Sequence, residues 1–169
     1  MASPIITLAD NLKTKLEANT SFTFTRRNAP YFKREDVEDG KWIIVAAGDE
    51  QAIRARNVDR STLIVDVAYQ ETMPDKTDAN PDPSENMTFF DNRMLLVEEV
   101  KNLFRGGGPL RNTTFDAGNL NALNQAIPVY FQSMSNSPIY RPDMIRDYQI
   151  FTSVVRLEFA GELPYSNLN

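Results

Sequence analysis

The residue types that carry most enzyme chemistry are missing from this sequence. Its 169 residues include no histidine and no cysteine. The commonest general base, the commonest transition-metal ligand and the thiolate nucleophile are therefore absent, and disulfides are excluded. A Ser-His-Asp triad is excluded for the same reason. Any catalysis would have to rest on carboxylate, lysine or tyrosine side chains.

Carboxylates are the remaining candidates for acid–base chemistry. Asp66 on an expected strand and Glu98 on an expected helix are the candidates for a small carboxylate-dependent enzyme. Glu98 and Glu99 are neighbours, but adjacent helical residues point about a quarter-turn apart and do not converge on one substrate. Glu98 is better placed to pair with Lys101 or Asn102. No pair has the pattern of an active site, so we predict that the protein is not an enzyme.

One acidic segment has the opening spacing of a calcium-binding loop. Asp78, Asn80 and Asp82 occupy alternate positions, as the first ligands of an EF-hand loop do. However, Pro83 stands where that loop needs glycine, and Phe89 stands where it needs a bidentate glutamate. We therefore predict a solvated loop, and we expect neither a metal nor a cofactor.

Three consecutive glycines raise the question of phosphate binding. A P-loop places its glycines between a strand and a helix and follows them with Lys and Ser or Thr. Gly106, Gly107 and Gly108 instead follow an expected helix and lead into Pro109. The pattern is typical of a helix terminator or a flexible hinge.

Arginine carries the strongest recognition signal in the chain. Its guanidinium makes bidentate contacts with carboxylates and stacks on aromatic rings, so it is favoured at interfaces. Scattered surface charge with no partner is the alternative, and the sequence leaves both open. The candidate interface residues, mostly at expected strand ends or in expected loops, are Arg26, Arg27, Arg54, Arg56, Arg60, Arg105, Gly106, Gly107, Gly108, Arg111 and Tyr165.

The overall charge argues against a nucleic-acid binder. The formal net charge is -5 and the isoelectric point is about 4.8. Phosphate contacts dominate nucleic-acid affinity, and a binder normally shows a basic excess that this chain lacks. No apolar run approaches the ~20 residues of a membrane span, so we expect no membrane partner.

The first half of the chain reads as one helix followed by strands. Apolar residues at helical spacing predict an amphipathic helix from about Pro4 to Ala18. Alternation or short apolar runs predict strands at Ser21–Arg26, Lys41–Ala47 and Thr62–Gln70. The intervening segment from Gly48 to Ser61 is polar and is expected to connect two strands.

The second half is less regular. Residues 71–85 are rich in Pro, Asp and Asn and are expected to form an exposed loop. A wide apolar face predicts a helix from about Met87 to Phe104. The segment from Leu110 to Asp147 looks irregular, with an edge strand at Ile127–Phe131 because of Pro128 and one helical turn at Arg141–Arg146. Residues 150–159 alternate as a strand, and residues 161–169 form a polar tail.

Strand clusters flanked by helices indicate an α+β fold. We expect a single domain over residues 1–169, with a mainly antiparallel sheet and two main helices packed on one face. The length suits one domain with a substantial core.

The order of these segments resembles that of bacteriophage tail terminator proteins, also called tail completion proteins or minor tail proteins of the U type. No single motif carries the resemblance, which covers most of the chain. The matching segments are the helix Ile5–Leu12, the strand Ser21–Arg27, the strand Trp42–Ala47, then Arg54, the strand Thr62–Gln70, the helix Leu95–Val100 and the stretch Arg146–Val155. The segment from Leu110 to Asp147 is longer than such proteins have.

The resemblance implies a structural virion protein at the head–tail junction, assembled in the host cytoplasm. Its subunits would form a homo-oligomeric ring, most often a hexamer, because a heterologous interface of suitable rotation closes on itself. The ring would cap the tail tube protein and join it to a head–tail connector or neck protein. Genome DNA would only pass through the lumen, where an acidic subunit would repel it.

Two other functions stay open at this point. A neck or head-completion protein that contacts the portal would have the same sequence features. A non-viral adaptor domain would bind peptides along an exposed sheet edge, beside Pro128.

Overall fold

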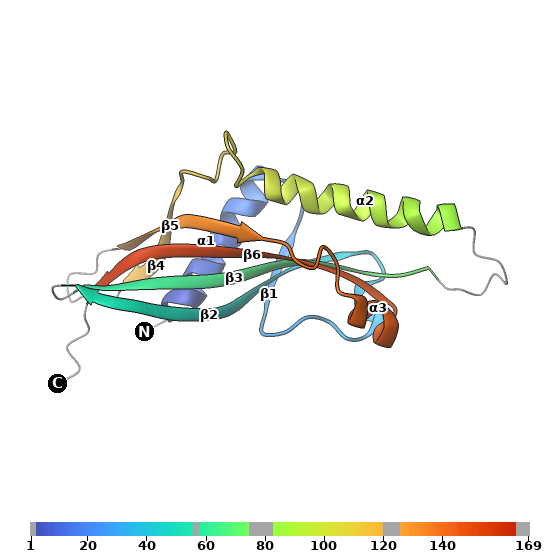
Figure 1. Ribbon diagram of the computed structural model, residues 1–169, viewed down its shortest axis with the longest axis horizontal. Helices are drawn as coiled ribbons and strands as arrows, with labels where there is room; N and C mark the ends of the chain where they lie inside the picture. The colour runs from blue at the N-terminus through green and yellow to red at the C-terminus, as the bar shows by residue number, and fades with distance from the viewer. Residues whose placement is uncertain (1–2, 56–57, 75–82, 120–125, 165–169) are drawn as a thin grey trace.

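The computed structural model describes residues 3–55, 58–74, 83–119 and 126–164. Strands predominate in this part of the chain, and helices flank them (Figure 1). The elements, in chain order, are α1 Pro4–Asn19, β1 Phe24–Arg27, the 3-10 helix η1 Arg34–Val37, β2 Lys41–Ala55, β3 Val58–Thr72, α2 Pro83–Asn102, β4 Thr114–Asn119, β5 Ala126–Ser135, α3 Pro142–Tyr148 and β6 Ile150–Pro164.

The strands form one curled, six-stranded sheet in the order β1-β2-β3-β6-β5-β4. Only β1 and β2 pair in parallel, and the other neighbours are antiparallel. The predicted α+β class with a mainly antiparallel sheet is therefore confirmed.

The predicted polar connection at Gly48–Ser61 is wrong. Strands β2 and β3 have 15 residues each and pair from Lys41↔Gln70 to Ala55↔Val58. Strand β6 then pairs with β3 along its full length. The backbone ladder needs no apolar side chain, so polar residues extend a strand when a neighbouring strand lies beside them.

Four further features differ from the sequence predictions. Residues 71 and 72 belong to β3 and residues 83–85 to α2, while 75–82, with the calcium-like spacing, lie outside the described residues. The segment predicted to be mostly irregular holds β4, β5 and α3; the predicted strand at Ile127–Phe131 lies within β5, and the predicted turn at Arg141–Arg146 overlaps α3. Pro128 is not on an edge strand, because β5 pairs with both β4 and β6. Gly161–Pro164, predicted as tail, continue β6.

The main core lies on the face of the sheet that carries Val67 and Val155. Helix α1 contributes Leu12 and Leu16, and helix α2 contributes Val97 and Val100, to the same apolar cluster. The packing of both helices on a single face stays a prediction. Helix α3 belongs to a second, smaller cluster with η1 and the start of β6. No helix in the described ranges is both long and apolar enough to cross a bilayer.

Helix α1 also reaches both outermost strands of the sheet. The Oε1 of Glu17 accepts a hydrogen bond from the Phe24 N–H on β1, at 2.9 Å. The Oδ1 of Asn11 accepts one from the Asp116 N–H on β4, at 3.3 Å. Edge strands expose unpaired N–H groups that invite another strand. The two side chains of α1 occupy one N–H group on each edge strand.

A charged cluster lies at the border of the core, where the sequence predicted an exposed loop. Glu71 is only 9% exposed and accepts bonds from the Arg93 guanidinium and the Tyr69 hydroxyl. The Arg93 guanidinium also lies over the Phe89 ring, 4.3 Å from its centroid. Burial and the bond to Glu71 raise the pKa of Tyr69 well above its ordinary value. The carboxylate therefore joins β3 to α2.

Candidate interaction surface

The structure distributes the predicted interface residues over several places. On β1, Arg26 forms an ion pair with Asp10 of α1, with 2.7 Å between Nε and Oδ1. The neighbouring Arg27 guanidinium lies over the Tyr31 ring, 3.8 Å from its centroid. Both arginines therefore have partners within the same chain.

Arg54 and Arg60 of the long hairpin are in strands, and the prediction that they lie in a loop is wrong. Arg54 on β2 stands opposite Asp59, and Arg60 on β3 stands opposite Ala52. Arg56 and Tyr165 lie outside the described residues.

Five predicted residues meet at the end of α2, and we call this place the basic notch. Arg105, Gly106 and Arg111 line a hollow of about 360 Å³ together with Phe131 and Gln132 of β5. Gly107 and Gly108 complete the turn that joins its two arginines. The sequence placed these residues in one segment, but only the tertiary structure sets them against the aromatic ring of β5.

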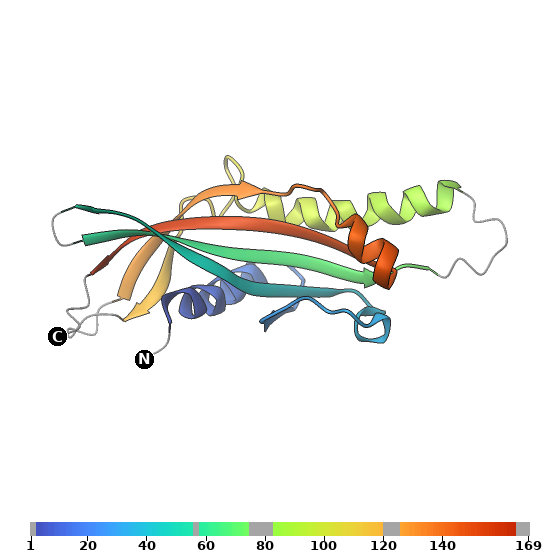
Figure 2. The same ribbon diagram turned by 60° about the horizontal axis from the view of Figure 1, so that its bottom comes forward.

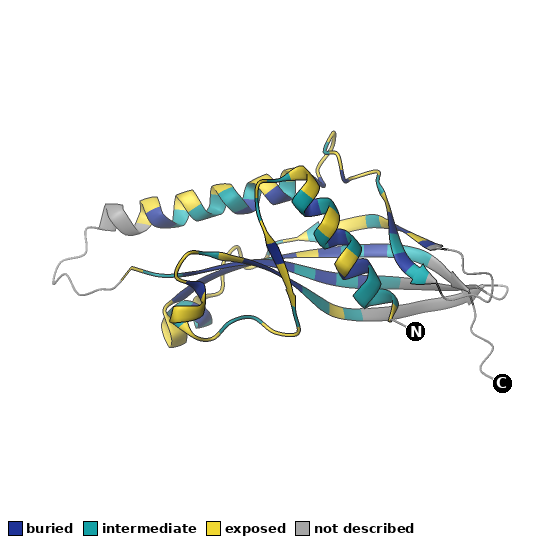
Figure 3. Cartoon of the chain, turned by 180° about the vertical axis from the view of Figure 1, so that it is seen from behind, coloured by how far each residue is buried: buried dark blue, intermediate teal, exposed yellow. Residues whose placement is uncertain are grey.

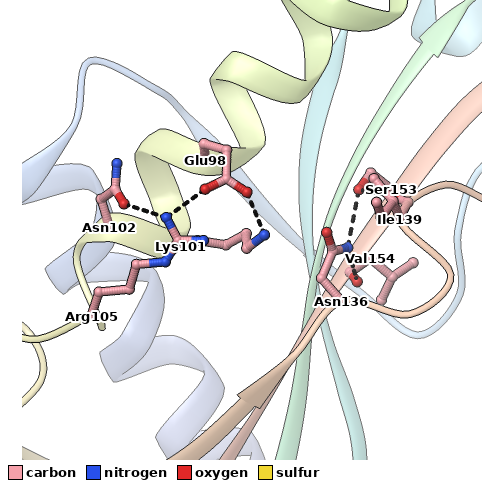
Figure 4. Close-up of polar contacts among 8 residues, drawn as sticks. All are labelled: Glu98, Lys101, Asn102, Arg105, Asn136, Ile139, Ser153 and Val154. Atoms are coloured by element: carbon pink, nitrogen blue, oxygen red, sulfur yellow. Dashed lines mark hydrogen bonds and ion pairs between the residues drawn. The ribbon is translucent and has the colours of Figure 1, made fainter.

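The two arginines of the basic notch differ in their partners. Arg105 forms an ion pair with Glu98 at 2.6 Å and donates to the Asn102 side chain at 2.8 Å (Figure 4). Lys101 also contacts Glu98, as the sequence predicted. The hydrogen bonds from Lys101 and Arg105 lower the pKa of the Glu98 carboxyl. Arg111 donates only a 3.3 Å bond to the Phe104 carbonyl, and no carboxylate among the described residues pairs with it.

Gly108 is needed in the turn because of its surroundings. A Cβ on Gly108 would collide with the carbonyl oxygens of Asn102 and Leu103. We expect Gly108→Ala to lower the free energy of unfolding by about 1–2 kcal/mol, the usual cost of overpacking. Gly106→Ala is the matched control, since nothing lies within 4 Å of its Cβ, and it should change that free energy by less than ~0.5 kcal/mol. Urea unfolding followed by circular dichroism measures both, and equal effects would contradict the steric explanation.

A second surface, not predicted from the sequence, surrounds α3; we call it the α3-end surface. Four large apolar side chains are 40–55% exposed there: Phe32, Ile139, Tyr140 and Tyr148. The Phe32 and Tyr148 rings meet edge to face at 5.2 Å. Seen from behind, α3 and the segments beside it are largely exposed (Figure 3). An exposed group of this size marks a surface that binds another molecule more often than isolated apolar residues do.

Buried polar bonds hold the segments of the α3-end surface on the sheet. Gln70 is fully buried; its amide accepts from the Tyr31 N–H at 2.7 Å and donates to the Tyr31 carbonyl at 3.1 Å. On the other side, Ser153 donates to the Ile139 carbonyl, and Asn136 donates to the Val154 carbonyl at 2.8 Å (Figure 4). The exposed aromatic residues are therefore carried by anchored backbone.

The α3-end surface borders a hollow of about 500 Å³ on the outer face of the sheet, with apolar residues such as Ile43 and Val154 in its lining. Asp66 and Arg156 form a bidentate pair in it, at 2.9 and 3.0 Å. The other candidate for acid–base chemistry, Glu98, lies on α2 in the basic notch region. The two carboxylates are therefore engaged by different cations at different places. No group of three acidic residues in the described ranges could hold a metal ion.

The sequence carried only a weak signal for the α3-end surface. Its aromatic residues come from two segments without periodicity, around Phe32 and between Ile139 and Tyr148. An isolated exposed aromatic residue is common, and only the fold brings these segments together. No protein-family model matches the chain, and no curated protein is significantly similar to it.

Proposed function

We propose that this chain is a structural subunit that assembles with copies of itself into a ring and joins other proteins to that ring. The observation that carries the proposal is the α3-end surface, where Phe32 and Tyr148 meet while 48% and 40% exposed. Apolar groups held on anchored backbone favour docking, because little conformational entropy is lost on binding.

The shape of the subunit supports a head-to-tail assembly. Helix α2 extends from the end of the molecule that carries α3 toward the basic notch, in both views (Figures 1 and 2). The apolar α3-end surface and the basic notch therefore differ in chemistry and lie apart along the subunit. Contacts between different surfaces of identical subunits are heterologous, and they close into a ring when the rotation is suitable.

The place of the ring in a virion comes from the resemblance of the segment order to tail terminator proteins. In this proposal the ring, a hexamer as in such proteins, caps the tail tube and binds the head connector at the head–tail junction. Binding two protein partners and leaving a passage for DNA requires recognition surfaces on the subunit, and it requires no catalytic site. Co-sedimentation with purified tube protein and, separately, with portal protein distinguishes a terminator from a neck protein.

Assembly of the purified protein tests the proposal. We expect mass photometry to detect one closed oligomer and electron microscopy to show rings with a central hole. Replacing Phe32 and Tyr148 by serine should weaken self-assembly or tube binding by about tenfold or more, as loss of an aromatic anchor does. The control is Tyr130→Ser, an aromatic residue that is 49% exposed on β5. A protein that stays monomeric and never binds tube ends would overturn the proposal.

A further inference from the structure

The basic notch carries positive charge that the chain itself does not balance. Lys101 and Arg105 both pair with a single carboxylate, Glu98, and Arg111 lines the same hollow as Arg105, so these three cations and one carboxylate leave a net of +2. Arg111 is exposed and lies 5.9 Å from the centroid of the Phe131 ring, beside the hollow of about 360 Å³. The notch therefore offers guanidinium donors beside an apolar wall, which suits the carboxylates of a protein segment.

The complementary charge is on a different part of the same chain, in a segment that we call the acidic turn. Glu35, Asp36, Glu38 and Asp39 are all exposed, and none has an ion-pair partner in the part of the chain that the structure describes. Val37 between them is fully buried and packs with Met144 and Ile150. The buried valine anchors the turn, so its carboxylates project from a fixed position beside the α3-end surface.

The notch and the turn of one chain do not meet. The turn is anchored next to α3, whereas the notch begins where α2 ends, at Asn102. Both views place the end of α2, near the middle of the long axis, apart from α3 (Figures 1 and 2). Phe90, which contacts Tyr140 of the α3-end surface, precedes Asn102 by twelve residues, a helical rise of about 18 Å.

We infer that the basic notch of one subunit receives the acidic turn of the next subunit around the ring. The occupant is a second copy of this chain, because the turn carboxylates and the Arg111 guanidinium have opposite charge and no ion-pair partner in the described part of the chain. The contact is heterologous and brings the α3-end surface of one subunit toward the Phe131 wall of its neighbour. The inference rests on the proposed self-assembly and assigns its electrostatic part to Arg105 and Arg111.

Charge reversal and its rescue test this contact. Arg111→Glu should raise the dissociation constant of the assembly by about tenfold or more, because it faces carboxylates across the interface. Glu38→Lys should have a comparable effect from the other side. The double variant, Arg111→Glu with Glu38→Lys, should recover most of the lost affinity. Mass photometry over a dilution series measures all three, and wild-type assembly should weaken as the salt concentration rises.

The controls separate a failure of this contact from a failure of the proposed function. Glu99→Lys reverses an exposed charge on α2 outside both surfaces and should assemble as the wild type does. Circular dichroism verifies that each variant is folded, and Arg111→Gln serves as a milder variant. If Arg111→Glu forms rings as well as the wild type does, the notch–turn contact is wrong and the proposed ring assembly still stands. If the wild-type protein is monomeric, the contact and the proposed function are both wrong. Arg111-dependent binding of a short DNA duplex, with unchanged assembly, would assign the notch to nucleic acid instead.

Discussion

Replacing Phe151 by alanine is expected to lower the free energy of unfolding by about 3–5 kcal/mol, the range for loss of a buried phenylalanine. The side chain is fully buried at the start of β6. Its ring lies 5.6 Å from that of Phe90, 6.1 Å from Phe89 and 6.3 Å from Tyr140, measured between centroids. Truncation removes the common neighbour of α2 and the α3-end surface and leaves a cavity between them.

Equilibrium unfolding in urea at a fixed protein concentration measures this cost, since assembly would otherwise change the apparent stability. Tyr130→Ala is the matched control, because it truncates an aromatic residue that is 49% exposed on a strand; its cost should stay below ~1 kcal/mol. A loss for Phe151→Ala no larger than that of the control would show that the aromatic cluster is not a stabilising core.

Replacing Glu71 by leucine is expected to lower the free energy of unfolding by about 2–3 kcal/mol, less than for a fully buried pair. The substitution leaves the Arg93 guanidinium, whose side chain is 27% exposed, and the Tyr69 hydroxyl without their shared acceptor. Breaking one side of a buried ion pair costs the desolvation of the remaining charge, and partial exposure of Arg93 reduces that cost.

A double-mutant cycle with Arg93→Met isolates the interaction. The double variant, Glu71→Leu with Arg93→Met, should be more stable than the sum of the single losses indicates, because no unpaired charge remains. Lys13→Met is the control: Lys13 pairs with Glu17 on the surface of α1, and its loss should cost less than ~0.5 kcal/mol. Strictly additive losses at Glu71 and Arg93 would mean that the two side chains are not coupled.

Local patterns predicted the elements whose apolar periodicity depends only on neighbouring residues. The first helix was expected from Pro4 to Ala18 and is observed from Pro4 to Asn19. The predicted strands at Lys41–Ala47, Thr62–Gln70 and residues 150–159 all lie within observed strands. The helix and two of the strands show apolar residues at a regular spacing, and the strand at Lys41–Ala47 shows a short apolar run, so each signal is present in the local sequence.

Long-range pairing decided the elements that were missed. The polar ends of β2 and β3 are strands because they pair with each other in a hairpin, and because β6, from a distant part of the chain, pairs along β3. Pro128 was expected to mark an edge, but it stands opposite Asp116 of β4, and β6 pairs with other residues of the same strand. Glu71 was assigned to an exposed loop, and only the approach of α2 makes it a buried partner of Arg93.

The sequence by itself determined which chemistry this protein lacks and to which fold class it belongs. The absence of histidine and cysteine is a property of composition, and the α+β class follows from periodicities of neighbouring residues. The tertiary structure alone decided which charges are balanced. Arg26 is paired because Asp10 of α1 lies beside β1, whereas Arg111 faces a hollow against Phe131 and pairs with no carboxylate of the described residues. Ion pairs form over a few ångströms between segments that are distant in sequence, and only the folded chain defines those distances.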